Sequence, residues 1–166
     1  NICFIGLMGS GKSIIGRDLS KIYNVDFVYN DIEIEKELGQ PINIIFENHG
    51  EKYFRSIEEI ICLKILNKNN CFISLGGGSI LSLKIRDMIK KNSYSIYLKV
   101  KKEIILDRLK NSKKRPLING VDKQSVIDKI YSERKKFYND ANFIVSNNID
   151  KKDIVMQIKN HINSLW

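Results

Sequence analysis

The run Gly-Leu-Met-Gly-Ser-Gly-Lys-Ser at residues 6–13 constrains this chain more than any other segment. It fits the pattern G-x-x-x-x-G-K-[ST] in full, follows a short apolar run and opens a segment of helical periodicity. Glycines let the backbone curl so that successive N–H groups point at phosphate oxygens, and a helix starting near Lys12 adds the positive end of its dipole. We therefore expect a loop that grips a nucleoside triphosphate, and not a turn that only joins a strand to a helix.

Two side chains of this loop have defined chemistry. We expect Lys12 to reach the β and γ phosphates of the bound nucleoside triphosphate and the Ser13 hydroxyl to coordinate Mg²⁺. The predicted nucleotide contacts in the loop are Gly9, Ser10, Gly11, Lys12, Ser13 and Ile14. GTPase switches, motor ATPases and small-molecule kinases share such a loop, so it leaves the phosphate acceptor open.

The rest of the chain alternates short apolar runs with longer helical patterns. We expect strands at 2–5, 25–29, 71–75, 95–100 and 142–146. We expect helices at 12–23, 42–48, 51–67, 84–91, 102–110, 123–138 and 152–165. This alternation is typical of an α/β protein, and it predicts a three-layer α/β/α fold with a five-stranded parallel sheet.

One basic segment breaks this rhythm late in the chain. Residues 111–122 carry Lys113, Lys114 and Arg115 between two expected helices, so we expect a mobile lid there. A lid suits a kinase because phosphoryl transfer without hydrolysis requires that water be displaced. The length of 166 residues is that of one ordinary domain, and we expect 1–166 to form a single kinase domain.

The charge of the chain admits several kinds of partner. Its 28 basic and 19 acidic residues leave a net charge of +9, which suits nucleic acid, an anionic membrane or small anionic ligands. Much of the excess is lysine in helical stretches, the usual sign of a solvated face. The opening apolar run is too short to span a bilayer and lacks a basic leader. We expect small-molecule substrates, no nucleic acid, no membrane, a cytoplasmic location and a monomer.

The cysteines and histidines predict no disulfide and no zinc site. Cys3, Cys62 and Cys71 show no C-x-x-C spacing and lie among apolar residues, so we expect them in the core of a protein from a reducing compartment. Neither His49 nor His161 lies in a cluster of metal ligands.

Several further segments together resemble the shikimate kinase family in order and spacing. They are Asp-Ile-Glu-Ile-Glu at 31–35, Phe-Arg-Ser-Ile-Glu at 54–58, Leu-Gly-Gly-Gly at 75–78, Arg-Pro-Leu at 115–117 and Arg-Lys-Lys-Phe-Tyr at 134–138. With the phosphate loop, the resemblance spans nearly the whole chain. It implies a nucleoside monophosphate kinase-like P-loop fold, an acceptor-binding helical region at about 31–60, and transfer of the γ-phosphoryl of ATP to the 3-hydroxyl of shikimate.

The chemistry of the residues agrees with an acidic acceptor. A guanidinium fork matches both oxygens of a carboxylate, so Arg55 and Arg134, following the resemblance, are the expected carboxylate clamp. Asp31 comes just past the carboxyl end of a strand, where open α/β sheets bind ligands. Its carboxylate can accept hydrogen bonds from acceptor hydroxyls and take the proton of the attacking one.

Two further features are expected to shape the acceptor site. Three consecutive glycines, Gly76, Gly77 and Gly78, would let backbone amides approach the acceptor, although a plain turn also uses glycine. Glu58 is expected to hold Arg55 in place, and a surface salt bridge at three-residue spacing is the competing interpretation.

Two more arginines are assigned to the nucleotide side. Arg115 in the lid would swing over the transferring phosphoryl group and neutralise developing charge, with a solvated basic loop as the alternative. By the resemblance, Arg108 would stack on the adenine ring, with an exposed helical arginine as the alternative.

One position departs from the family pattern. The family usually has Asp-x-Asp where this chain has Tyr29-Asn30-Asp31, and the first aspartate is associated with the magnesium shell. A tyrosine cannot replace a carboxylate charge at neutral pH. We expect Mg²⁺ to rest on Ser13, phosphates and water, and to bind less tightly unless a neighbour substitutes.

Two alternatives to a shikimate kinase stay open from the sequence. A gluconate or nucleoside monophosphate kinase could use the same scaffold, because a fold does not fix the acceptor. A basic nucleic-acid-binding ATPase module is supported by the charge alone.

Overall fold

The described residues form alternating strands and helices. A computed structural model describes residues 1–110, 122–148 and 150–165. The strands are β1 (Ile2–Ile5), β2 (Asp26–Tyr29), β3 (Cys71–Ser74), β4 (Tyr94–Lys99) and β5 (Phe143–Ser146). The helices are α1 (Lys12–Tyr23), α2 (Asn30–Leu38), α3 (Ile42–Leu66), the 3-10 turn η1 (Ser79–Leu81), α4 (Leu83–Asn92), α5 (Lys102–Leu109), α6 (Lys123–Tyr138) and α7 (Lys151–Asn163).

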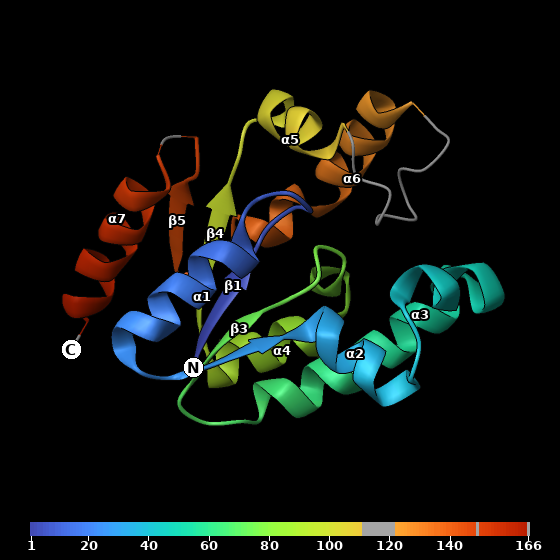
Figure 1. Cartoon of the computed structure of the whole chain (residues 1–166), viewed down its shortest axis with the longest axis horizontal. Coiled ribbons are helices and arrows are strands. Elements are labelled where there is room, and N and C mark those ends of the chain that lie inside the picture. Colours follow the sequence, from blue (N-terminus) through green and yellow to red (C-terminus); the bar gives the residue numbers. More distant parts are fainter. Residues whose placement is uncertain (111–121, 149, 166) are drawn as a thin grey trace.

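All five strands pair in parallel, in the order β2-β3-β1-β4-β5. Phe4 on the central strand β1 lies opposite Ser74 of β3 on one side and Ile96 of β4 on the other. The carboxyl ends of the strands therefore meet at one edge of the sheet, where chain segments leave β1, β2 and β3 toward different helices (Figure 1). Such an edge is where open α/β sheets bind ligands.

Helices cover both faces of the sheet. The side chains of a strand alternate between the two faces, so successive residues of β1 pack against different helices. On β1, Ile2 and Phe4 pack into a cluster with residues of α1 and α7. Cys3 and Ile5 pack on the opposite face with residues of α3, α4 and α6. The predicted three-layer α/β/α architecture with a five-stranded parallel sheet is confirmed.

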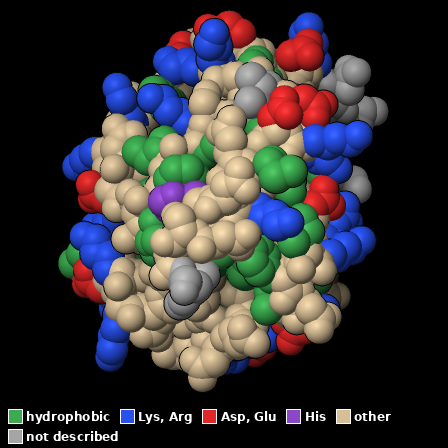
Figure 2. All heavy atoms as spheres, turned by 90° about the vertical axis from the view of Figure 1, so that its left-hand side faces the viewer, with side chains coloured by type: hydrophobic (Ala, Val, Ile, Leu, Met, Phe, Trp, Pro, Cys, Tyr) green, Lys and Arg blue, Asp and Glu red, His purple; other side chains and the backbone are tan. Residues whose placement is uncertain are grey.

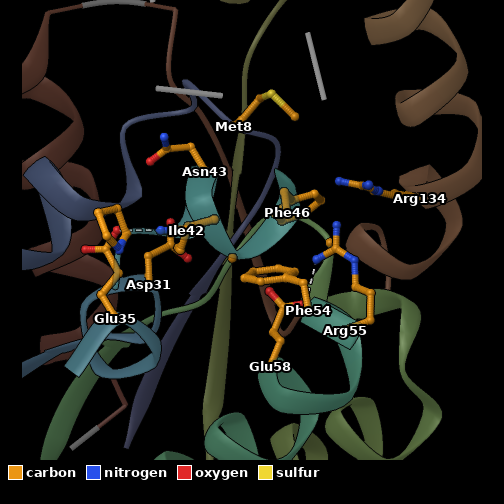
Figure 3. A pocket seen from close by; sticks show the side chains of 14 residues that line it. Met8, Asp31, Glu35, Ile42, Asn43, Phe46, Phe54, Arg55, Glu58 and Arg134 are labelled. Carbon is orange, nitrogen blue, oxygen red and sulfur yellow. Dashed lines mark hydrogen bonds and ion pairs between the residues drawn. The ribbon is translucent and has the colours of Figure 1, made fainter. Parts of the chain in front are cut away.

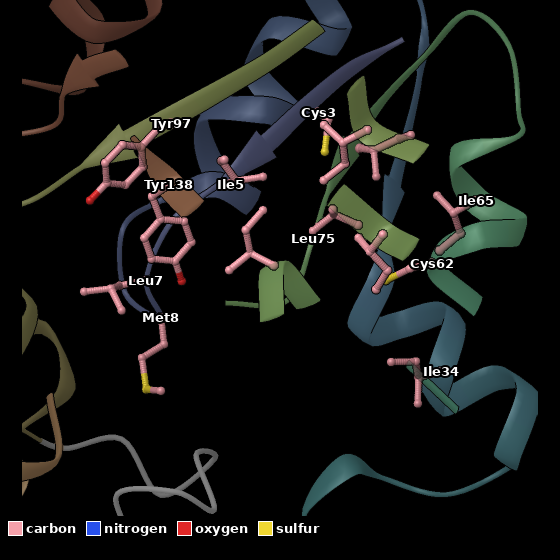
Figure 4. Close-up of a cluster of buried hydrophobic side chains, with 14 of the residues drawn as sticks. Cys3, Ile5, Leu7, Met8, Ile34, Cys62, Ile65, Leu75, Tyr97 and Tyr138 are labelled. Carbon is pink, nitrogen blue, oxygen red and sulfur yellow. The ribbon is translucent and has the colours of Figure 1, made fainter. Parts of the chain in front are cut away.

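The three cysteines are core residues, as expected. Cys3, Cys62 and Cys71 are all buried and free. Burial raises the pKa of the Cys62 thiol well above its ordinary value, so the neutral thiol is the form present. Cys3 and Cys62 lie in the larger apolar cluster with Ile65 and Leu75 (Figure 4).

The strands and helices that we predicted are confirmed with small shifts, and one further helix is present. Every strand begins and ends within one residue of its expected bounds. The hydrophobic pattern predicted no separate helix at Asn30–Leu38, although the family resemblance implied a helical region from about residue 31, and the structure has α2 there. It predicted two helices across 42–67, and the single α3 is interrupted inside by Gly50, whose φ of 75° and ψ of 175° are not helical.

The expected lid and its arginine fall mostly outside the described residues. Of the segment 111–122, only Asp122 is described, and its side chain accepts hydrogen bonds from the N–H groups of Gln124 and Ser125. Asp122 is therefore the N-cap of α6 and belongs to that helix. Arg115 lies outside the described residues.

The lysines and arginines on the face shown in Figure 2 lie at the surface, as expected for a solvated face. There, Lys and Arg side chains are spread around the rim and alternate with acidic and neutral groups. This view gives no continuous basic stripe of the kind that follows a nucleic-acid backbone. Among the described helices, none has both the length and the apolar character needed to cross a bilayer.

Candidate active site

The phosphate loop joins β1 to α1, as the sequence motif requires. Gly9 and Gly11 have φ values of 74° and 91°, in the left-handed region that favours glycine. The N–H of Ser10 donates to the carbonyl oxygen of Leu7 at 3.2 Å, and the N–H of Ile15 donates to that of Gly11 at 3.0 Å. The backbone thus curls tightly and passes directly into the first turn of α1.

Lys12 and Ser13 stand at the start of α1. Lys12 is buried, and its Nζ donates to the carbonyl oxygens of Gly6 and Leu7, at 2.9 Å each. Two carbonyl oxygens of the loop thereby hold the ammonium group against the loop backbone. The hydroxyl oxygen of Ser13 lies 3.4 Å from that of Ser74 at the end of β3.

A cavity of about 500 Å³ adjoins this loop and suits the nucleotide. Its lining includes Gly9, Gly11, Lys12, Ser13, Ile14, Ile15, Arg108, Asn147 and Lys151. Arg108 is at this cavity, where the sequence placed it, and its Nη1 donates to the carbonyl oxygen of Gly9 at 2.9 Å. The guanidinium therefore bonds the phosphate loop and borders the cavity beside it.

Asn147, which was not predicted from the sequence, supports the phosphate loop through a hydrogen bond to its backbone. It is buried after β5, and its Nδ2 donates to the carbonyl oxygen of Ser10 at 2.6 Å. A Cβ atom on Gly11 would lie 2.7 Å from the same Nδ2, so glycine is needed there for space as well as for φ. A polar residue directly after the last expected strand was the only available signal.

A second cavity, of about 400 Å³, lies between the phosphate loop, α2, α3 and α6. Its lining is Met8, Asp31, Glu35, Pro41, Ile42, Asn43, Phe46, Phe54, Arg55, Glu58, Gly76, Gly77, Gly78 and Arg134. Figure 3 shows Arg55 and Arg134 at one end and Asp31, Glu35 and Asn43 at the other. The cavity is therefore basic at one end and rich in oxygen acceptors at the other.

Arg55 is fixed by carboxylates of its own helix. Its Nη1 donates to Glu58 at 2.5 Å, and its Nε and Nη2 donate to one oxygen of Glu51 at 3.2 Å and 3.0 Å. Burial opposes the positive charge, yet the ion pairs with Glu58 and Glu51 raise the pKa of Arg55 above its ordinary value. The guanidinium of Arg55 therefore stays charged, and its hydrogen bonds fix its orientation.

Glu58 is an interior group, which favours the orienting role over a surface salt bridge. Its side chain is 2% exposed, and its second oxygen accepts from the hydroxyl of Ser79 at 2.7 Å. Burial raises the pKa of Glu58, and the charge of Arg55 works against that rise. One oxygen of the Glu58 carboxylate thus binds the guanidinium of Arg55, and the other is fixed by Ser79.

Arg134 brings a second guanidinium to the same end of the cavity. It is 3% exposed, and its Nε has no hydrogen-bond partner in the described part of the chain. An unmatched buried N–H on a cation is costly, because hydration is lost without replacement. Arg134 also lines the acceptor cavity, so its guanidinium can meet an anion there, which fits a carboxylate clamp.

Two of the three glycines, Gly76 and Gly78, are required by their neighbours. A Cβ on Gly76 would lie 2.5 Å from an oxygen of Glu58, and one on Gly78 would lie 2.4 Å from the guanidinium of Arg55. A side chain at either position would displace the Arg55–Glu58 pair. Glycine at these two positions therefore makes room for the ion pair.

Asp31 lies where the acceptor cavity meets the phosphate loop. It is in the first turn of α2, directly after β2, and lines both the acceptor cavity and a smaller one of about 60 Å³. The smaller cavity also borders Lys12, Ser13 and Ser74. An oxygen placed there would contact both the acceptor group and the phosphate-binding residues.

Mg²⁺ fits this small cavity only if other oxygens complete its shell. Mg²⁺ prefers six oxygen ligands, and it commonly keeps waters and substrate phosphates among them. Ser13, Ser74 and Asp31 offer oxygens, while Tyr29 lines the cavity with its ring packed edge-on against Phe27 at a centroid distance of 4.4 Å. Within the described residues, no group of three His, Cys, Asp or Glu side chains could hold an ion.

Several lining residues of the acceptor cavity were not identified from the sequence. Phe46 and Phe54 form its apolar wall, with ring centroids 4.6 Å apart. Glu35 accepts a hydrogen bond from the N–H of Ile42 at 3.0 Å, which ties α2 to the start of α3. Asn43 adds a carboxamide to the acidic end. These residues read as ordinary helix positions until α2 and α3 are placed together.

Comparisons with known proteins agree with this geometry. A family model for shikimate kinase matches residues 8–163. A shikimate kinase from a Sulfurihydrogenibium species is 40% identical over 154 residues, covering 92% of this chain and 89% of that protein. The structure of shikimate kinase from Acinetobacter baumannii in complex with shikimate has a TM-score of 0.95 at 29% identity, covering 99% of this chain and 93% of that one. A gluconokinase from Sinorhizobium meliloti, with a TM-score of 0.68 at 14% identity over 99% of this chain and 92% of that one, shares the fold alone. Since the family model and the relatives match most of its length, this chain belongs to the shikimate kinase family.

Proposed function

We propose that this protein transfers the γ-phosphoryl group of ATP to the 3-hydroxyl of shikimate, giving shikimate 3-phosphate and ADP. The observation that carries the proposal is the cavity beside the phosphate loop, with the buried guanidinium of Arg134 at one end and Asp31 at the other. A small ring acid with hydroxyl groups matches this polarity. Membership of the family supports shikimate as that acid.

The acceptor is bound by its carboxylate. Arg134 and Arg55 both line the cavity, and Arg55 presents a guanidinium already oriented by Glu58. Two converging guanidinium groups fix both the position and the rotation of a carboxylate. Phe46 and Phe54 exclude water from one wall, and the hydroxyls then face Asp31.

Asp31 positions and deprotonates the attacking hydroxyl. A carboxylate between the acceptor cavity and the phosphate loop can accept a hydrogen bond from that hydroxyl and take its proton as the bond to phosphorus forms. The oxygen is thereby held in line with the γ-phosphoryl group, and positioning of this kind supplies much of the rate enhancement.

The phosphate loop stabilises the charge of the transferred group. Lys12 releases the carbonyl oxygens of Gly6 and Leu7 and bonds phosphate oxygens, which are stronger acceptors because they are charged. Mg²⁺ neutralises phosphate charge when it is bound, and Ser13 is the side chain that would hold it. Arg115, from the lid, completes the proposal as the cation that covers the γ-phosphoryl group.

An acceptor panel tests the activity. Purified protein is incubated with ATP and Mg²⁺ and with shikimate, gluconate or a nucleoside monophosphate in turn, and formation of ADP is measured. We expect rapid ADP formation with shikimate alone. Turnover that is equal without an acceptor, or faster with gluconate or a nucleotide, would refute the assignment.

The remaining parts of the proposal concern partners and location. We infer a monomer in the cytoplasm with no nucleic-acid partner. Light scattering should give the mass of one chain, and retention on immobilised DNA should be weak at physiological salt. Salt-dependent DNA binding without turnover of small molecules would favour the nucleic-acid-binding ATPase instead.

A further inference from the structure

Tyr138, the last residue of α6, ends in a hydroxyl that reaches the glycine turn after β3. This hydroxyl donates to the carbonyl oxygen of Gly77 at 2.5 Å. The side chain has an exposed fraction of 0%, and its ring stacks on that of Tyr97 with centroids 5.1 Å apart and planes 20° apart. Figure 4 shows the two rings side by side in the core. Packing therefore holds the hydroxyl in one place.

The glycine turn has no side chains with which to fix its own peptide groups. Within the described residues, the N–H groups of Gly77 and Gly78 have no acceptor, whereas the N–H of Ser79 donates to the carbonyl oxygen of Gly76 at 3.2 Å. Both Gly77 and Gly78 line the acceptor cavity. Their N–H groups are therefore donors for which a bound ligand could supply the acceptor.

A single bond to the Gly77 carbonyl can orient one of these donors. The carbonyl of Gly77 and the N–H of Gly78 belong to the same planar peptide group, in which they point in opposite directions. A bond that directs the carbonyl toward Tyr138 therefore directs the N–H of Gly78 away from α6. Without it, this peptide could rotate, since glycine permits more backbone conformations than other residues.

The same helix carries Tyr138 and Arg134, one turn apart. Residues four positions apart lie on one face of a helix, so both side chains project toward the glycine turn. A Cβ on Gly77 would lie 3.6 Å from Nη1 of Arg134. One face of α6 thus supplies a guanidinium for the acceptor and a hydroxyl for the backbone that lies beside it.

We propose that Tyr138 is a positioning residue for the acceptor: its hydroxyl orients the peptide between Gly77 and Gly78 so that the turn presents its N–H to the acceptor. This inference rests on the proposed function. Burial raises the pKa of Tyr138 to about 12, so the hydroxyl keeps its proton and remains a donor at neutral pH.

Two variants separate this role from packing of the ring. Tyr138→Phe keeps the stacked ring and removes the hydroxyl. Tyr97→Phe is the matched control, because it removes a hydroxyl from the other ring of the same stack. Each variant is compared with wild type for the KM of shikimate, the KM of ATP, kcat and the midpoint of thermal unfolding.

For Tyr138→Phe we expect the KM of shikimate to rise about five- to tenfold, the effect of one net hydrogen bond, while the KM of ATP stays within about twofold. Tyr97→Phe should leave both constants near wild type. Equal changes in the two variants, or parallel changes in both KM values, would show that Tyr138 only packs.

A measurement on the wild-type protein keeps the inference testable if Tyr138→Phe does not fold. In a protein labelled with ¹⁵N, the amide signals of Gly77 and Gly78 should shift on titration with shikimate and stay unchanged with ADP. Shikimate binding that leaves both amides unmoved would overturn the positioning role. Wild-type protein that neither binds nor phosphorylates shikimate would instead refute the proposed function.

Discussion

At the scale of single residues, Asp31 joins the two halves of the site. Asp31→Asn keeps the size of the side chain and removes its ability to take a proton. We expect kcat to fall about 10²- to 10⁴-fold, the usual contribution of a positioned base. The affinity for ADP, measured by calorimetry, should stay within about twofold, because Asp31 does not line the nucleotide cavity. Glu37→Gln, at an exposed position of the same helix, is the control. Unchanged turnover in Asp31→Asn would remove Asp31 from the mechanism.

Tyr29 stands at the position where the family usually has an aspartate associated with the magnesium shell. It borders the small cavity with Lys12, Ser13 and Asp31 but brings no charge to balance a cation. In Tyr29→Asp, a second carboxylate would face that cavity, and we expect about tenfold tighter binding of Mg²⁺ to the protein–ADP complex, since opposite charges a few ångströms apart attract strongly near a protein surface. Calorimetric titration with MgCl₂ measures this directly. A dissociation constant equal to that of wild type would show that the position lies outside the metal shell.

Glu58 gives the stability of the protein a distinct dependence on pH. Burial raises the pKa of this carboxyl above its ordinary value of 4.5. The folded state therefore binds a proton more readily than the unfolded state, so this contribution to stability is complete below pH 4.5 and is lost as pH rises through the raised pKa. The glutamine of Glu58→Gln cannot titrate, so this variant does not lose stability in this way as pH rises. Measured by urea unfolding, the stability of wild type relative to Glu58→Gln should fall as pH rises through that window.

Glu59, the neighbouring residue, is the control of opposite sign. A hydrogen bond from Lys84, assisted by Ser82, lowers the pKa of Glu59. The stability that Glu59 contributes to the fold is present above the ordinary carboxyl pKa, and it is lost as pH falls through the lowered pKa of Glu59. The stability of wild type relative to Glu59→Gln should therefore fall toward acid. Curves of the same sign for both variants would contradict the assignment for Glu58.

At the scale of the elements, the break inside α3 shapes the acceptor cavity. Phe46 precedes Gly50 and Phe54 follows it, and the change of direction brings the two rings together on the cavity wall. With φ of 75° and ψ of 175°, Gly50 occupies a region that is essentially restricted to glycine. A Cβ atom at Gly50 would meet no neighbour within 4 Å, so the main cost of a substitution there is backbone strain.

Gly50→Asn should therefore lower the free energy of unfolding by about 1–3 kcal/mol. Gly39→Asn is the matched control, because Gly39 has φ of 66° and ψ of 16°, a left-handed conformation that asparagine tolerates, and is equally open. The control should lose well under about 1 kcal/mol. Urea unfolding of both variants measures the difference. Equal losses would show that the conformation at Gly50 is not retained in solution.

The sequence predicted those elements whose signal is local. Strands buried on both faces read as apolar runs, and the phosphate loop is written in consecutive residues, so both were found with their bounds. Helix α2 gave no periodic pattern because Ile34 is its only fully buried apolar side chain, so the family resemblance alone implied a helical region there. Asn147 acts through a hydrogen bond to a residue 137 positions away, and Glu35 through a bond to the first residue of the next helix, so neither leaves a local sequence pattern. The positions of Arg55 and Arg134 were predicted through the family resemblance, since no local pattern unites residues on two separate helices.

At the scale of the whole molecule, the site consists of two cavities with separate linings. The nucleotide cavity lies over the phosphate loop, Arg108 and Asn147. The acceptor cavity is built from α2, α3, the glycine turn and α6, and Asp31 stands between the two. Each ligand should therefore stabilise the fold through contacts of its own, and a change in one cavity should leave the response to the other ligand intact.

Arg134→Lys tests this separation. At a shikimate concentration of 100 times the wild-type dissociation constant, binding should raise the free energy of unfolding by about 2.7 kcal/mol in wild type. A lysine keeps the charge and loses the fork, and tenfold weaker binding would reduce the gain to about 1.4 kcal/mol. Stabilisation by ADP should be equal in both proteins, and Lys129→Arg, at an exposed position of α6, should match wild type for both ligands. A role limited to the acceptor cavity leaves the stabilisation by ADP unchanged. If Arg134→Lys loses as much stabilisation by ADP as by shikimate, Arg134 instead supports the whole fold.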